Sequence, residues 1–268
     1  MRDTIYRRHR QLEGWPLVFT ILVTVSILIG GLVEFIPLAL VKDNVPRIAS
    51  VTPFTPLEVI GRDVYIREGC VNCHSQMIRP FRAEMERYGD FTKAGETIYE
   101  HPFLWGSKRT GPDLQRVGGK YPHLWHVRHM DDPRSTSNGS LMPPYPWLLR
   151  DDLDFASIPR RLRALSRVGV PYSDAEITGA VAAAEAQAAE IAREVASQGG
   201  PAGLERKEIA ALVAYLQRLG TDLRTGQTPR DPASNNDTAP IPADSLNVGA
   251  ARPTGDSATA AAADSANN

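Results

Sequence analysis

The chain has 268 residues, a formal net charge of -1 at neutral pH and a pI near 6.6. This balance argues against nucleic-acid binding, which usually leaves a basic footprint. The chain contains two cysteines, both in one short motif, so a disulfide framework is not expected and the cysteines do not indicate the redox compartment. The length suits one or two domains, although the ends of the chain are not typical of a globular protein.

Residues 14–41 are predicted to form a single transmembrane anchor. Residues 14–33 carry no charge, and a further apolar run follows Glu34, which makes the segment long enough to cross a bilayer. A cleaved signal peptide is the alternative, but its apolar core would be shorter and a small-residue cleavage site would follow closely. The segment is preceded by a cluster of arginines, namely Arg2, Arg7, Arg8 and Arg10. This bias predicts that residues 1–13 are cytoplasmic and that the rest of the chain is exported.

Residues 42–53 are interpreted as a linker, and residues 54–220 as the main domain. The run Thr55-Pro56-Leu57-Glu58 has the form of a helix start, with a capping threonine, a proline in the first turn and a capping-box glutamate. We expect this helix to continue into a cysteine motif at residue 70. A second helix is predicted over residues 205–219, where apolar residues recur at helical spacing. Loops rich in Gly, Pro and aromatic residues are expected between the two helices.

The run Cys70-Val71-Asn72-Cys73-His74 is typical of a covalent attachment site for a c-type haem. A turn of helix would place the two thiols about 5 Å apart, where each can form a thioether to one haem vinyl group. His74 would then ligate the iron. The alternatives are half of a zinc site or a C-x-x-C redox pair. Zinc would need two more ligands, and the chain has no other cysteine.

An iron held by His74 alone has an open sixth position, and methionine is the usual partner where the task is electron transfer. Met142 is the preferred candidate, because it is distant enough to close a loop over the haem and the proline-rich Pro143-Pro144-Tyr145-Pro146 follows it. Met130 is the alternative, with core packing as its other expected role. Two methionines lie too near His74 in the sequence to reach the opposite face and are expected to pack in the core, Met77 and Met85.

Other residues could support the haem. A ligating histidine needs a hydrogen bond at its second ring nitrogen, often to a backbone carbonyl, and the carbonyl of Pro112 in Gly111-Pro112-Asp113-Leu114 is the candidate. Basic residues near the motif could neutralise the haem propionates or could form a solvated basic rim. The candidates are Arg79, Arg82, Lys108 and Arg109.

The remaining histidines of this region are His101, His123, His126 and His129. The last three recur at a spacing of three, which on a helix suggests a metal site. The third residue, however, rotates away from the face of the first, and the sequence offers no carboxylate or cysteine to complete the site. We therefore expect structural or surface roles for these side chains.

Residues 61–148 closely resemble the monohaem subunit II of cbb3-type cytochrome c oxidases. The motifs CHSQMIRPFRAE and FLWGSKRTGPDL are far more specific than C-x-x-C-H, and the anchor and the final AYLQRLG segment also match. The resemblance covers most of residues 7–220. It implies a mainly α chain with a class I cytochrome c domain. In that domain one covalent haem c is carried by Cys70, Cys73, His74 and Met142, and Pro112 supports His74.

The resemblance has further implications for packing and partners. In this fold, Gly61 and Tyr65 would pack on Tyr215 and Leu212. The implied partners are a catalytic subunit that holds haem b, haem b3 and copper, and a dihaem cytochrome c subunit. Ser107 lies in a stretch that, in this family, approaches a calcium ion near the propionates of the catalytic subunit. The implied location is the bacterial inner membrane, with the haem domain in the periplasm.

The expected function is that of a membrane-anchored relay that passes one electron at a time, while oxygen reduction and proton pumping belong to the catalytic subunit. One alternative is the cytochrome c subunit of a nitric oxide reductase, a family that lacks the FLWGSKRTGPDL block. Another is a free membrane-tethered electron shuttle. A third is a haem-based sensor or binding module, which would need an easily displaced sixth ligand and an output domain.

Two regions depart from the family pattern. Residues 173–197 are rich in alanine and begin with a capping box at Ser173 and Glu176, so a long helical insertion is predicted. Residues 221–268 contain no aromatic residue and are rich in Ala, Asp, Pro, Ser and Asn, which predicts a disordered tail. Neither region is expected to take part in the chemistry.

Overall fold

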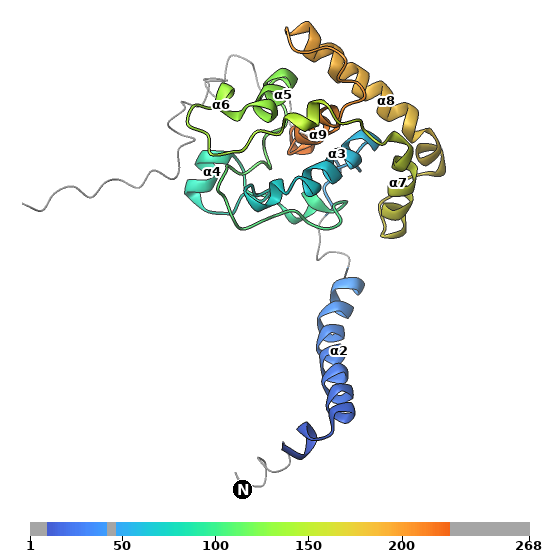
Figure 1. Ribbon diagram of the computed structural model, residues 1–268. Helices are drawn as coiled ribbons and strands as arrows, with labels where there is room; N and C mark the ends of the chain where they lie inside the picture. Colours follow the sequence, from blue (N-terminus) through green and yellow to red (C-terminus); the bar gives the residue numbers. More distant parts are fainter. Residues whose placement is uncertain (1–9, 42–46, 226–268) are drawn as a thin grey trace, which may run out of the picture. The chain divides into compact units, whose positions relative to one another are not determined.

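The computed structural model describes residues 10–41 and 47–225 (Figure 1). Most of the predicted cytoplasmic N-terminus, part of the predicted linker 42–53 and nearly all of the predicted tail 221–268 lie outside the described residues. The chain divides into two compact parts, each considered by itself below. Among the described residues, one part comprises those up to residue 51 together with residues 93–98, and the other comprises residues 52–92 and those from residue 99 onward.

The described residues are mainly α-helical, as predicted, and contain no β-strand beyond an isolated bridge between Asp152 and Lys207. The α-helices are α2 (Pro16–Leu40), α3 (Pro56–Arg67), α4 (Arg82–Tyr88), α5 (His123–Asp131), α6 (Pro133–Thr136), α7 (Ile158–Arg167), α8 (Asp174–Ser197), α9 (Glu208–Arg218) and α10 (Asp222–Thr225). Short 3₁₀ helices span Cys70–Asn72, Ala94–Thr97, Pro146–Leu149 and Phe155–Ser157. The region between α3 and α9, which was expected to be mostly loops, therefore also contains several helices.

Helix α2 is a candidate membrane span. Its segment Pro16–Leu38 has a mean hydropathy of 2.4, and none of the most apolar window is buried against other residues. Trp15 precedes the helix, and Pro16 occupies the first helical position, where its missing N–H costs nothing. The hydroxyls of Thr20 and Thr24 each donate to the carbonyl four residues earlier, at 2.8 Å. Their polar groups are thus satisfied within the helix, as an apolar surrounding requires.

Helix α3 begins as predicted but ends earlier than expected. Thr55 Oγ1 accepts from the Glu58 amide at 3.4 Å, and Glu58 Oε2 accepts from the Thr55 amide at 2.8 Å, which completes the capping box. The expectation that α3 continues into the cysteine motif is wrong, because α3 ends at Arg67. Gly69 has a φ of +72°, a left-handed conformation that glycine adopts without steric cost. The chain then turns into the 3₁₀ helix Cys70–Asn72.

Helix α9 begins three residues later than predicted. Residues 206–208 are instead bonded to residues 151–153: the Leu153 amide donates to the Arg206 carbonyl at 2.8 Å, and the Glu208 amide donates to the Asp151 carbonyl at 3.1 Å. The extended conformation of Lys207, which immediately precedes the helix, accommodates this pairing. These long-range bonds override the local helical pattern of the sequence at residues 205–207.

The long alanine-rich helix is confirmed as α8, and the predicted capping box at Ser173 and Glu176 is present. One stripe of α8 is buried, made of Ile177, Ala180, Ala184, Ala188, Ile191, Ala192 and Val195. This stripe brings α8 against α3, α5, α7 and α9, and Figure 1 shows α7 beside the first turns of α8. The small side chains allow close approach of the helices, so the insertion forms part of the domain core.

Candidate functional site

The cysteine motif forms a tight turn directly after α3. The amides of Cys73 and His74 both donate to the Cys70 carbonyl, at 3.1 and 2.9 Å. Cys70 is half-buried and Cys73 is exposed. Burial raises the pKa of the Cys70 thiol to about 12. This environment differs from that of a C-x-x-C redox pair, in which the reactive thiol has a lowered pKa.

The imidazole of His74 is oriented by the loop that precedes α5. Its Nδ1–H donates to the Pro112 carbonyl at 2.8 Å, which leaves Nε2 with the lone pair that a metal needs. Burial lowers the pKa of His74, which favours the neutral, metal-binding form. A Cβ on Gly111 would lie 2.3 Å from His74 Cε1, so the ring is seated against backbone that only glycine permits. These residues fit one covalently attached haem whose iron is bound by His74.

Residues 105–114 run alongside the motif and fix the position of His74. The Gly111 amide donates to the Cys73 carbonyl at 2.9 Å, and the Leu114 amide donates to the Ser75 carbonyl at 2.8 Å. These two bonds lie on either side of the contact between His74 and Pro112. The placement of the Pro112 carbonyl therefore depends on backbone pairing between two segments nearly 40 residues apart, rather than on the proline alone.

The two candidate sixth ligands have different environments. Met130 is buried, with 8% of its surface exposed, and belongs to the core at the end of α5. Met142 is half-buried at the edge of the core, in the loop before Pro146–Leu149. This loop is held at two points: the Tyr145 amide donates to the Met130 carbonyl at 2.7 Å, and Trp147 Nε1 donates to Glu68 Oε2 at 2.9 Å. The second bond ties the loop to the residues just before the motif.

The other two methionines, Met77 and Met85, differ in how far they are buried. Met77 is half-buried, and its backbone amide donates to Asp113 Oδ2 at 2.9 Å. Met85 lies on α4 with 36% of its surface exposed, so the expectation of core packing is wrong for this residue. Helix α4 is short, and none of its residues is buried.

The basic residues considered for the propionates are paired to different extents. Arg79 Nε lies 2.7 Å from Glu84 Oε1, and Arg82 Nε lies 2.7 Å from Glu86 Oε1, with 90% of the Arg82 side chain exposed. Arg109 is largely buried and contacts Glu84 at 2.8 Å. Ser107 and Lys108 are exposed in the loop before Arg109. The propionate role of Arg79 and Arg82 and the calcium role of Ser107 remain predictions.

The histidines of α5 have individual packing roles. His123 Nδ1 lies 2.8 Å from Glu194 Oε1 and so links α5 to α8. His126 is fully buried, and burial lowers its pKa to about 3. His129 stacks on Trp125 with ring centroids 4.6 Å apart, and its Nδ1 contacts Thr136 Oγ1 at 2.7 Å. Within residues 10–41 and 47–225, no three His, Cys, Asp or Glu side chains are grouped so that they could hold a metal ion.

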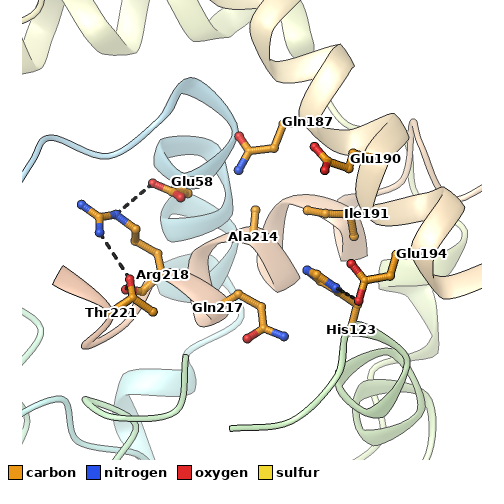
Figure 2. Close-up of a pocket in the computed structure, with 10 residues that line it drawn as sticks. All are labelled: Glu58, His123, Gln187, Glu190, Ile191, Glu194, Ala214, Gln217, Arg218 and Thr221. Carbon is orange, nitrogen blue, oxygen red and sulfur yellow. Dashed lines mark hydrogen bonds and ion pairs between the residues drawn. The ribbon is translucent and has the colours of Figure 1, made fainter. Parts of the chain in front are cut away.

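A separate cleft of about 270 Å³ lies where α3, α8 and α9 meet the start of α5 (Figure 2). Several of its polar side chains have partners: Arg218 Nε lies 3.4 Å from Glu58 Oε2, across the cleft lining, and Gln187 Oε1 accepts from Oγ1 of Thr55, a residue outside the lining, at 2.8 Å. None of its lining residues belongs to the motif or to the loop beside His74. They are Glu58, His123, Gln187, Glu190, Ile191, Glu194, Ala214, Gln217, Arg218 and Thr221.

Comparison with known families agrees with this geometry. Residues 9–223 match the family model described as cytochrome c oxidase, mono-heme subunit/FixO. No curated protein matches the chain at a significant level. The family match extends from the residues before α2 through the motif and the His74 loop to residues beyond the end of α9. The chain therefore belongs to the FixO family of mono-haem subunits of cytochrome c oxidase.

Proposed function

We propose that this chain is the membrane-anchored monohaem c-type cytochrome of a cbb3-type oxidase. It relays electrons from a dihaem cytochrome c subunit to the catalytic subunit, which holds haem b, haem b3 and copper and reduces oxygen to water in aerobic or microaerobic respiration. The observation that carries the proposal is the C-x-x-C-H turn whose histidine donates to the Pro112 carbonyl at 2.8 Å. That arrangement presents one imidazole nitrogen to a metal beside two thiols.

The bound haem supplies one-electron redox chemistry, and the chain supplies its attachment and its ligands. Cys70 and Cys73 would hold the haem through thioethers, while His74 and Met142 would bind its iron. The hydrogen bond to Pro112 keeps the proton of His74 on Nδ1 and its lone pair on Nε2. The chain makes and breaks no substrate bond, so it acts as an electron-transfer subunit.

The loop that carries Met142 supports a relay rather than a sensor. A sensor needs a sixth ligand that leaves easily, whereas this loop contains three prolines and is bonded to α5 through Tyr145 and to Glu68 through Trp147. Such restraint lowers the entropy that a weak thioether bond must overcome. A methionine ligand also keeps the reduction potential high enough to accept electrons from another cytochrome.

The proposed topology places α2 in the bacterial inner membrane, with residues 1–13 in the cytoplasm, anchor 14–41, linker 42–53 and the cytochrome domain 54–220 in the periplasm. The apolar character of Pro16–Leu38 and the preceding arginines support it. In the complex, Arg79 and Arg82 are proposed to face propionates. Ser107 is proposed to lie near a calcium ion held mainly by the catalytic subunit.

Purification of the complex through a tag on this chain tests the proposal. We expect a haem-copper catalytic subunit and a dihaem cytochrome c to co-purify, with both b-type and c-type haem present. Co-purification with the catalytic subunit of a nitric oxide reductase would favour that alternative. Recovery of the haem-loaded chain without any other subunit would favour a free electron shuttle.

A further inference from the structure

Asp113 is a buried carboxylate, and both of its oxygens accept hydrogen bonds. Its side chain has 0% exposure. Oδ2 accepts from Ser75 Oγ at 2.5 Å, from the Met77 amide at 2.9 Å and from Arg109 Nη2 at 3.3 Å, and Oδ1 accepts from the Gln115 amide at 2.8 Å. Every partner is a donor, as an ionised carboxylate requires. A buried charge with this many bonds holds its surroundings in one arrangement.

Arg109 forms hydrogen bonds to two of the residues that also bond to Asp113, namely Ser75 and Met77. Its Nε donates to Ser75 Oγ at 2.6 Å, and its Nη2 donates to the Met77 carbonyl at 2.8 Å. The guanidinium also forms a two-point contact with Glu84 of α4 at 2.8 Å, the geometry in which arginine binds carboxylates most specifically. Arg109 thereby connects the segment after His74 to α4.

Asp113 and Arg109 both bond to Ser75, the residue that follows His74. Ser75 follows His74 in the chain, and Asp113 follows Pro112, so the bond between Ser75 and Asp113 joins the next residues of the two segments. The length of the His74–Pro112 hydrogen bond depends on how these segments lie against each other. Asp113 and Arg109 fix that relation through side chains, in addition to the backbone pairs.

We propose that Asp113 and Arg109 are positioning residues that set the strength of the His74–Pro112 hydrogen bond and, through it, the reduction potential of the haem. This inference rests on the proposed attachment of haem to Cys70, Cys73 and His74. A hydrogen bond donated by Nδ1 makes the imidazole a more basic ligand, which favours ferric over ferrous iron. Replacing Asp113 or Arg109 should therefore weaken the His74–Pro112 hydrogen bond and raise the reduction potential of the haem.

Asp113→Asn in the full-length chain is the first test. An asparagine places an NH₂ group where the carboxylate accepts hydrogen bonds, so it cannot satisfy all four donors. The thioethers are untouched, and covalent haem should be retained. At the potential where the wild type is half reduced, we expect the ratio of ferrous to ferric haem to rise on the order of tenfold, which corresponds to about 59 mV in a one-electron couple.

Arg109→Gln separates positioning from simple electrostatics. Removal of a positive charge near the haem would by itself favour ferric iron and lower the potential, whereas loosening of the His74 hydrogen bond raises it. The proposal predicts a rise in both variants, together with faster solvent exchange of the His74 Nδ1 proton by NMR. Asp152→Asn is the matched control, because Asp152 is exposed and pairs with Lys207 at 2.7 Å; its potential should equal that of the wild type.

The outcomes distinguish this inference from the proposed function. A wild-type chain without covalent haem would contradict the proposed function itself. Normal haem attachment with an unchanged or lowered potential in Arg109→Gln would overturn the positioning role. If that variant does not fold, Ser75→Ala provides the milder test, because it removes only the hydroxyl that links Arg109 to Asp113. A potential and an exchange rate equal to those of the wild type in Ser75→Ala would then overturn the inference.

Discussion

Gly61 on α3 lies directly against the Ala211 carbonyl on α9, so that a Cβ on Gly61 would be 1.9 Å from that oxygen. This contact brings the rings of Tyr65 and Tyr215 to a centroid separation of 5.4 Å. The Tyr215 hydroxyl donates to Gln76 Oε1 at 2.9 Å. The contact between α3 and α9 is thus linked through Tyr215 to Gln76, the second residue after His74.

Gly61→Ala should separate the two helices and destabilise the domain. Forcing extra volume into a packed contact typically costs about 1–3 kcal/mol, which denaturant unfolding of the haem-loaded full-length chain would measure. Gly179→Ala is the matched control, since nothing lies within 4 Å of its Cβ position on α8. There the same substitution should stabilise the helix by roughly 0.5–1 kcal/mol. Equal stability of the Gly61 variant and the wild type would show that the close contact is not required.

The sequence was sufficient to predict helices with strong local signals. The capping boxes at Thr55 and Ser173 mark the starts of α3 and α8, because each involves residues only three positions apart. The end of α3 at Arg67 was missed, since the presence of Gly69 near a helical pattern does not by itself show a left-handed conformation. Helices α4, α5 and α7 were also missed, because the Pro and aromatic residues around them indicated loops.

His126 should make the domain less stable in acid. Burial, together with the neighbouring His129 and His123, lowers its pKa to about 3, whereas the unfolded chain has a histidine pKa of about 6.5. The free energy of unfolding is therefore not reduced by His126 above pH 6.5. It decreases as the pH falls towards 3, because the unfolded chain binds the proton that buried His126 does not. At pH 5, protonation of this histidine in the unfolded chain lowers the free energy of unfolding by about 2 kcal/mol.

Unfolding free energies between pH 7.5 and 4.5 would measure this effect. In His126→Gln the dependence on pH should become shallower, whatever the absolute stability of the variant. Part of the dependence should remain, because burial also lowers the pKa of His129, to about 4. His101→Gln serves as the control, since that side chain is exposed. An identical pH dependence in the wild type and His126→Gln would contradict the prediction.

Covalent attachment depends on the two thiols of the motif. Cys70→Ala or Cys73→Ala should remove one thioether and weaken haem retention, and the double variant should lose its haem in acidic acetone. Haem staining after denaturing electrophoresis provides the measurement. Haem that resists extraction in the double variant would show that attachment occurs elsewhere.

The arginine bias before α2 gives a prediction about topology. A reporter that is active only outside the cytoplasm should function when fused after Gly220 and should be inactive when fused after Arg10. Reversal of the charge bias, by changing Arg2, Arg7, Arg8 and Arg10 to Glu, should reduce the activity of the Gly220 fusion. Activity of the wild-type Arg10 fusion without activity at Gly220 would place the haem domain on the cytoplasmic side.

The candidate site was predictable to the extent that its residues are adjacent in sequence. The C-x-x-C-H run and the Gly-Pro pair at residues 111–112 led to His74 and its partner carbonyl, which the structure places 2.8 Å apart. The group formed by Asp113, Arg109 and Ser75 was missed as a unit. Its members come from two segments more than 30 residues apart, and the sequence suggested for Arg109 only contact with the propionates or a place in a solvated basic rim.

The proposal that His74 and Met142 hold the haem iron of an electron relay is tested most directly by Met142→His, with Met130→Leu as the control. The histidine variant should retain its covalent haem but lose the weak far-red charge-transfer band of thioether-ligated ferric haem. Its reduction potential should fall, and each 30 mV costs about 0.7 kcal/mol of driving force, so oxygen consumption should slow. Met130→Leu should keep the band and the potential. Survival of the band in Met142→His, or its loss in Met130→Leu, would contradict the assignment of Met142.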